Sequence, residues 1–153
     1  MKILLVYDTQ YGNTEQIAKA IAGGLSSSGE VRTLKISEIK ATDVDGINLL
    51  IVGSPTQGSK ATPAIQKFLD TLPKNSLKDT KSAAFDTRMT NRIIRMFGYA
   101  APKIAKSLEG KGATQLVQPE GFWVKSGKGP LKEGELERAA TWAGTIINAL
   151  KYT

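Results

Sequence analysis

The sequence contains no cysteine and no histidine. Without cysteine there is no disulfide, no thiolate metal site and no cysteine nucleophile. Without histidine there is no histidine-based triad, no ordinary zinc centre and no imidazole to act as general acid or base near neutral pH. We therefore expect no metal site. Any chemistry must come from a bound cofactor or from carboxylates, hydroxyls, lysine and arginine.

Long apolar runs are also missing. No segment approaches the ~20 apolar residues of a membrane-spanning helix, and the first apolar run is too short for a secretory signal peptide. Hydrophobic residues at 41% and charged residues at 23% are typical of a soluble globular protein. We expect residues 1–153 to form a single domain in the cytoplasm, with no membrane span.

Acidic residues are outnumbered, with 14 Asp and Glu against 21 Lys and Arg, for a net charge of +7. This charge favours anionic partners but says little about the fold. The basic residues are scattered and no known nucleic-acid-binding motif is present, so we do not expect nucleic acid as a partner.

Short apolar runs alternate with amphipathic segments along the chain. The runs are typical of buried strands, and the segments repeat apolar residues at helical spacing. We expect strands at residues 3–7, 31–36, 47–52, 81–86 and 114–117, the last with a further stretch at 122–124 that can extend it. Helices are expected at residues 13–28, 62–72 and 136–150, and from residue 102 to 110 or 112. This alternation predicts a three-layer α/β fold, an open parallel sheet with helices on both faces. Residues 87–99 are interpreted as a loop with a helical turn.

The segment Thr9–Thr14 joins the first expected strand to the first helix. Such a turn presents unpaired backbone N–H groups at the positive end of a helix dipole, where a phosphate can bind. Thr9 and Thr14 add hydroxyl donors, and Gly12 lets the backbone approach a ligand closely. The loop has no lysine or arginine and matches neither the P-loop nor the G-x-G-x-x-G pattern. The alternative is an ordinary turn whose Thr and Asn side chains cap the helix.

Two further loops end on the same edge of the predicted sheet, because parallel strands share one carboxyl edge. These are residues 53–59, after the third strand, and Asp86–Arg88, at the end of the fourth. In open parallel sheets, ligands bind beyond this edge, at the point where the strand order reverses. The convergence of three distinctive loops therefore favours a phosphate-containing ligand over an ordinary turn.

Residues 7–15, Tyr-Asp-Thr-Gln-Tyr-Gly-Asn-Thr-Glu, include a segment that resembles the T-x-[TY]-G-N-T phosphate loop of flavodoxins. The resemblance covers essentially the whole chain, in the short form without an insertion in the last strand. It implies a flavodoxin-like sheet of strand order 2-1-3-4-5, noncovalently bound FMN, and electron transport between redox partner proteins. It also implies a monomer or weak homo-oligomer, with no catalytic side chain.

The resemblance also implies which residues bind the cofactor. The FMN phosphate is expected to lie against Thr9, Gln10, Tyr11, Gly12, Asn13 and Thr14. One side of the ring is expected to face Ser54, Pro55, Thr56, Gln57 and Gly58, and the other Asp86, Thr87 and Arg88.

The chain departs from the flavodoxin pattern in three respects. The second and third loops offer no aromatic side chain to stack on the ring; Tyr99 is a candidate, with core packing as the alternative. The chain is basic where flavodoxins are commonly acidic, which favours an acidic redox partner. Arg88 also brings a cation toward the ring, unless it forms a solvated pair with Asp86 worth roughly 0–1 kcal/mol.

Two other functions share this topology. An FMN-dependent oxidoreductase of the quinone or protoporphyrinogen type needs a substrate pocket beside the ring, which residues 87–99 can supply. A phospho-acceptor receiver needs an acidic residue at the end of the third strand, where this chain has Gly53 and Ser54. The receiver is therefore excluded, and the oxidoreductase stays as the alternative to an electron carrier.

Overall fold

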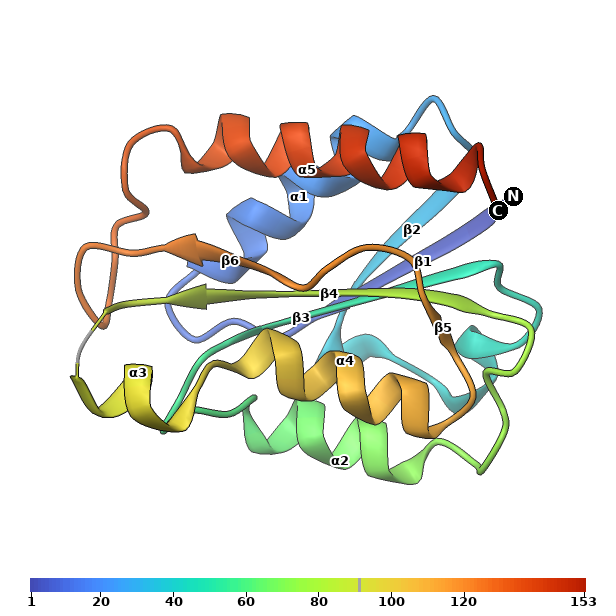
Figure 1. Cartoon of the computed structure of the whole chain (residues 1–153), viewed down its shortest axis with the longest axis horizontal. Helices are drawn as coiled ribbons and strands as arrows, with labels where there is room; N and C mark the ends of the chain where they lie inside the picture. Colours follow the sequence, from blue (N-terminus) through green and yellow to red (C-terminus); the bar gives the residue numbers. More distant parts are fainter. Residues whose placement is uncertain (91) are drawn as a thin grey trace.

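A parallel sheet forms the middle layer of the computed structural model, which describes residues 1–90 and 92–153. Its five main strands lie in the order β2-β1-β3-β4-β5, as expected (Figure 1). They are β1 (Lys2–Tyr7), β2 (Glu30–Lys35), β3 (Leu49–Pro55), β4 (Lys81–Arg88) and β5 (Thr114–Gln115). Two short strands pair with β4 along the same side. β5 pairs with its amino end and stops at Gln115, and β6 (Glu120–Trp123) then pairs with its carboxyl half. Pro119, which has no N–H to donate to a ladder, lies in the interruption.

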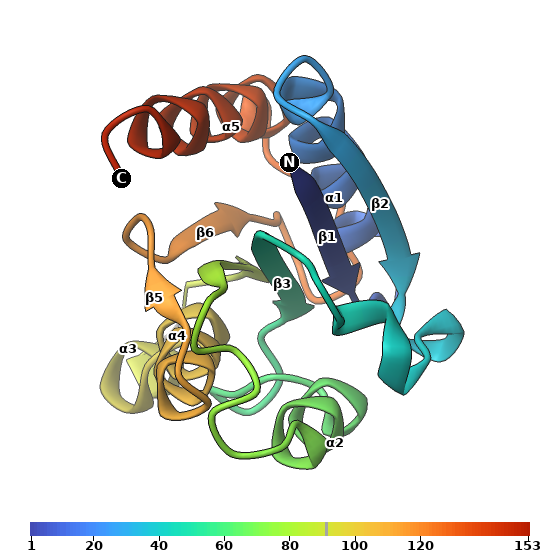
Figure 2. The ribbon, with the colours of Figure 1, turned by 90° about the vertical axis from the view of Figure 1, so that its right-hand side faces the viewer.

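Helices cover both faces of the sheet (Figure 2). One face packs against α1 (Asn13–Leu25) and α5 (Glu135–Leu150), and the other against α2 (Pro63–Thr71) and α4 (Ala100–Gly110). Successive side chains of a strand point to opposite faces of the sheet. Leu5 therefore packs in the core beneath α1 and α5, and Leu4 in the core beneath α2 and α4. This is why the central strands are apolar on both faces. The smaller elements are η1 (Ile36–Glu38), η2 (Ala41–Val44) and α3 (Arg92–Phe97).

Local sequence signals explain several helix boundaries. The α2 start is confirmed, because the Thr62 hydroxyl accepts a hydrogen bond from the Ile65 N–H at 3.3 Å and Pro63 follows at the first position. The first helix ends three residues earlier than expected, at Leu25. Its last turn closes there because Ser26 bonds the Gly23 carbonyl through both its backbone N–H and its hydroxyl.

No helix among residues 1–90 and 92–153 combines the length and the apolar character needed to cross a bilayer.

Two adjacent glycines in α1 offer a matched test of how closely α1 and α5 pack. A Cβ added at Gly24 would lie 2.6 Å from the Cβ of Ala143, whereas a Cβ at Gly23 meets nothing within 4 Å. We expect Gly24→Ala to lower the free energy of unfolding by about 1–3 kcal/mol, because the helices must move apart. Gly23→Ala should raise it by up to about 1 kcal/mol, because alanine favours a helix. Urea denaturation measures both, and equal effects would contradict the close helix contact.

Candidate functional site

A cavity of about 80 Å³ opens at the carboxyl edge of the sheet, where the three predicted loops meet. Ten predicted residues line it: Thr9, Gln10, Tyr11, Asn13, Thr14, Pro55, Thr56, Gln57, Thr87 and Arg88. Within the described part of the chain, the predicted residues that are not in its wall are Gly12, Ser54, Gly58 and Asp86. Met89, Val124 and Gly127 also line it and were not predicted.

The first loop keeps its hydrogen-bond donors free for a ligand. Gly12 has φ +91°, which only glycine adopts readily, and its carbonyl accepts the first hydrogen bond of α1, from Gln16. The Thr9 hydroxyl accepts from the Gly12 N–H at 2.9 Å, so its own proton stays available. Among residues 1–90 and 92–153, the backbone N–H groups of Gln10, Tyr11, Asn13 and Thr14 have no protein acceptor. This set of neutral donors at a helix N-terminus fits a phosphate.

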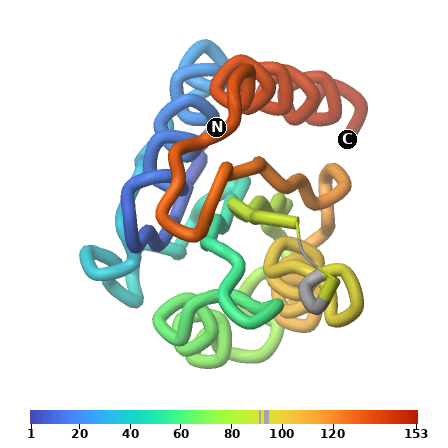
Figure 3. Tube along the Cα trace, turned by 90° about the vertical axis from the view of Figure 1, so that its left-hand side faces the viewer, coloured from blue at the N-terminus to red at the C-terminus, as the bar shows by residue number. Residues whose placement is uncertain are grey.

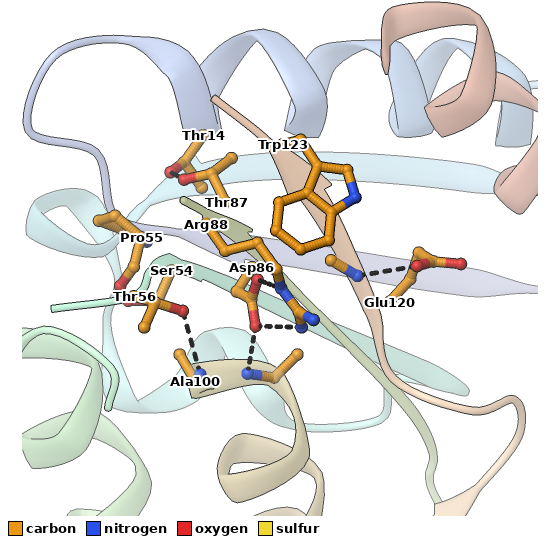
Figure 4. Close-up of polar contacts among 12 residues, drawn as sticks. Thr14, Ser54, Pro55, Thr56, Asp86, Thr87, Arg88, Ala100, Glu120 and Trp123 are labelled. Carbon is orange, nitrogen blue, oxygen red and sulfur yellow. Dashed lines mark hydrogen bonds and ion pairs between the residues drawn. The ribbon is translucent and has the colours of Figure 1, made fainter. Parts of the chain in front are cut away.

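Side-chain hydrogen bonds fix the three loops to one another. The buried hydroxyls of Thr14 and Thr87 lie 2.8 Å apart, which joins α1 to the end of β4 (Figure 4). Gln57 donates its side-chain amide to the Gln10 side-chain carbonyl at 2.7 Å. The cavity walls are thus linked in pairs, the first loop with the second and with the third.

The first loop is also anchored below the cavity. Asp8 accepts from the Thr9 N–H at 2.8 Å and from the Thr62 hydroxyl at 2.7 Å, which ties the loop to the start of α2. The Tyr7 hydroxyl donates to Glu15 at 2.8 Å. Burial and this bond raise the pKa of Tyr7 to about 12. The same bond lowers the pKa of Glu15, so this carboxylate stays ionised in the first turn of α1.

The second loop contains a tight turn at residues 57–60. Gln57 and Lys60 exchange backbone hydrogen bonds of 2.8 and 3.2 Å across it. Gly58 and Ser59 have φ +55° and +65°, the signature of a type I′ turn. The turn places the Gln57 side chain in the cavity wall while Gly58 stays outside it.

The third loop differs most from its predicted form, because Asp86 and Arg88 make a buried pair instead of a solvated one. Asp86 is fully buried, and its carboxylate accepts from the Arg88 guanidinium at 2.7 and 2.8 Å (Figure 4). The Ala101 N–H, at the start of α4, adds a bond of 2.8 Å. Burial raises the pKa of the Asp86 carboxyl, and the bonds from Arg88 and Ala101 oppose that shift. The Arg88 charge is therefore committed to the protein.

The same guanidinium explains the position of Tyr99. Its central carbon lies 3.7 Å from the centroid of the Tyr99 ring, a close cation–π contact, and 5.8 Å from that of Trp123. Tyr99 is not in the cavity wall of the described residues. Its half-buried ring packs on an arginine and belongs to neither hydrophobic core, so the core-packing alternative does not describe it.

The element that the sequence analysis missed is the hairpin Val124–Gly134, which we call the β6–α5 hairpin. It is closed by an antiparallel bridge between Val124 and Leu131 and by a 2.9 Å bond from the Lys125 N–H to the Pro130 carbonyl. It runs beside the first loop (Figure 3). The Asn13 side chain donates to the Lys128 carbonyl at 3.2 Å. Its glycines and proline predict a turn, but nothing in the local sequence indicates what the turn contacts.

A network of charged side chains holds the base of this hairpin. Glu135 accepts from the Trp123 N–H at 2.7 Å and from Arg138, whose guanidinium also pairs with Glu120 at 3.1 Å. Burial would raise the pKa of Glu135, but the bonds from Arg138 and Trp123 keep it below its ordinary value. The hairpin is thereby fastened where it leaves β6 and where it enters α5.

Comparisons with known proteins agree on one family. A family model described as Flavodoxin matches residues 5–142. A curated protein named Flavodoxin, from Clostridium saccharobutylicum, is 30% identical over 99% of this chain and 98% of its own length. Among solved structures, oxidised flavodoxin 2 from Bacillus cereus superposes with a TM-score of 0.82 at 24% identity, covering 97% of this chain and 99% of its own. A flavodoxin from the domain Archaea gives 0.79 at 23% identity, with 99% of both chains covered.

Proposed function

The chain belongs to the flavodoxin family, and we propose that the cavity at the carboxyl edge of its sheet is the FMN site. As a member of this family it binds FMN and transfers electrons, and the oxidoreductase alternative is not favoured. The free hydrogen-bond donors of the first loop are the observation that supports this placement. Its free backbone N–H groups and its Thr9 hydroxyl belong to residues in the wall of a cavity shared with the two other loops of the same edge.

The residues divide into two groups in this proposal. The first loop, Thr9–Thr14, holds the phosphate through neutral donors. The ring lies against the parts of the second and third loops that line the cavity, Pro55, Thr56 and Gln57 in one and Thr87 and Arg88 in the other. Bound FMN accepts and releases electrons through its ring, and the protein supplies binding, orientation and exclusion of water. The linked side chains Thr14–Thr87 and Gln10–Gln57 keep these walls in place before the ligand arrives.

The phosphate assignment predicts discrimination between FMN and riboflavin, which lacks the phosphate. Charge-assisted hydrogen bonds contribute about 1.5–3 kcal/mol each, so we expect FMN to bind at least about tenfold more tightly. Thr9→Ala should weaken FMN binding and leave riboflavin binding unchanged. Titration of the apoprotein, followed by quenching of flavin fluorescence, measures all four affinities. Equal affinity of the unmodified protein for FMN and riboflavin would show that the phosphate site is misplaced.

We further propose that the redox partner is acidic and docks over α3. This helix lies at the carboxyl edge of the sheet. The Lys103 ammonium, on α4, donates to the Phe97 carbonyl at the end of α3 at 2.9 Å and to the Ser59 carbonyl of the second loop at 2.5 Å, and so links the two segments. Met96 and Phe97 are 76% and 63% exposed there, beside the exposed cations Arg92 and Arg95. An apolar centre with a basic rim suits a transient partner of opposite charge. A cytoplasmic protein that is a monomer or a weak homo-oligomer fits this role.

A further inference from the structure

The β6–α5 hairpin is in direct contact with the loop proposed to hold the phosphate. Gly129 has φ +96°, and a Cβ there would lie 2.6 Å from the side-chain amide of Asn13. Only glycine fits at this position. Together with the bond from Asn13 to the Lys128 carbonyl, the contact fixes the hairpin tip against the first turn of α1.

The hairpin is a firm support for the side chains that it carries. The Gly129 N–H donates to the Ser126 carbonyl at 3.0 Å, and the Ser126 hydroxyl donates to the Gly129 carbonyl at 2.7 Å. The Lys132 N–H donates to the Trp123 carbonyl at 2.9 Å, so the two arms stay paired down to the base. Because the backbone is held at tip and base, the position of Lys128 relative to the first loop is set by the fold.

The hairpin also brings positive charge to a loop that has none of its own. It carries Lys125, Lys128 and Lys132, all exposed. The Lys128 ammonium lies 6.0 Å from the centroid of the Tyr11 ring, and the Tyr11 N–H is one of the free donors of the first loop. Arg88, which lines the cavity, has its charge engaged by Asp86.

We propose that Lys128 is a binding residue for the FMN phosphate and that the β6–α5 hairpin is a fourth wall of the cofactor site. This inference rests on the function proposed above. Lysine binds phosphate as a flexible point charge, which complements the fixed N–H groups of the loop. The phosphate is then held by neutral donors on one side and by an ammonium at the rim. Part of the affinity for FMN therefore depends on ionic strength.

The test compares Lys128→Gln with Lys151→Gln, which removes the same charge from an exposed residue just after α5. The C-terminal end of α5 lies away from the carboxyl ends of the strands (Figure 1). We expect Lys128→Gln to weaken FMN binding by about threefold to tenfold at low salt, because one close charge pair is lost. Lys151→Gln should leave it within about twofold, since charges beyond a Debye length are screened. Lys128→Arg should retain the affinity of the unmodified protein. Riboflavin binding should not respond to any of the three.

The salt dependence of FMN affinity is a second measurement, and it would not change if Lys128 had only a structural role. The difference between Lys128→Gln and the unmodified protein should shrink as the salt concentration rises from about 20 mM to about 0.5 M. The inference is overturned if Lys128→Gln matches Lys151→Gln, or if it weakens riboflavin as much as FMN. Failure of the proposed function looks different, because the unmodified protein itself would then bind FMN no better than riboflavin.

Discussion

Replacing Asp86 by asparagine is expected to destabilise the protein by about 3–5 kcal/mol, the usual cost of removing one partner of a buried ion pair. The substitution keeps the side-chain shape but leaves the Arg88 guanidinium, 15% exposed, without its counter-charge. The free energy of unfolding in urea measures the loss. Apoprotein should be used, so that changes in cofactor affinity do not enter the result.

Two Arg→Gln variants, one in the buried pair and one in an exposed pair, separate the effect of burial from the effect of losing an arginine. Arg88→Gln leaves the buried Asp86 carboxylate uncompensated and should be similarly costly. Arg32→Gln breaks an exposed pair with Asp43, at 2.9 Å, and should cost no more than about 1 kcal/mol. If Asp86→Asn and Arg88→Gln cost as little as Arg32→Gln, the pair is solvated and the buried arrangement is wrong.

Replacing Gly53 by alanine is expected to cost about 3 kcal/mol, at the upper end of typical overpacking. Gly53 pairs with Phe85 across β3 and β4, and a Cβ there would lie 2.0 Å from the tip of the Phe85 ring. The ring cannot easily move, because it meets Phe122 and Trp142 edge-on, with centroids 6.2 and 6.1 Å away. Urea denaturation measures the loss.

A double-mutant cycle identifies the cause of that loss. Phe85→Leu makes room for the added methyl group, so the double variant Gly53→Ala/Phe85→Leu should be more stable than the sum of the two single effects predicts. The coupling should be favourable by about 1 kcal/mol or more, in the range found for residues in contact. Strict additivity would mean that the aromatic ring does not set the requirement for glycine.

The sheet and the meeting of three loops were predictable, because both follow from local patterns. The apolar run Leu49–Val52 is buried on both faces, which only a central strand allows. Parallel strands then place their following loops on one edge, whatever the details of packing. The N-cap at Thr62 followed by Pro63 was visible for the same reason, since the donor and acceptor lie three residues apart.

The burial of the Arg88 side chain was not predictable, because it depends on Gly121, which lies far along the chain. A Cβ on Gly121 would lie 2.0 Å from the Arg88 side-chain nitrogen, so the arginine lies where β6 presents a glycine. The pairing of β6 with β4 creates that space, and the pattern of residues around Arg88 carries no sign of it. Long-range packing of this kind decides between a solvated and a buried pair.

The contact between Asn13 and Lys128 joins two positions that are 115 residues apart in the sequence. During synthesis the ribosome therefore releases the first wall of the cavity long before the hairpin that completes it. A nascent chain that has emerged only as far as β4 has the free N–H groups of the first loop without Val124 or Gly127 beside them. The cavity wall is therefore complete only after the β6–α5 hairpin has been synthesised.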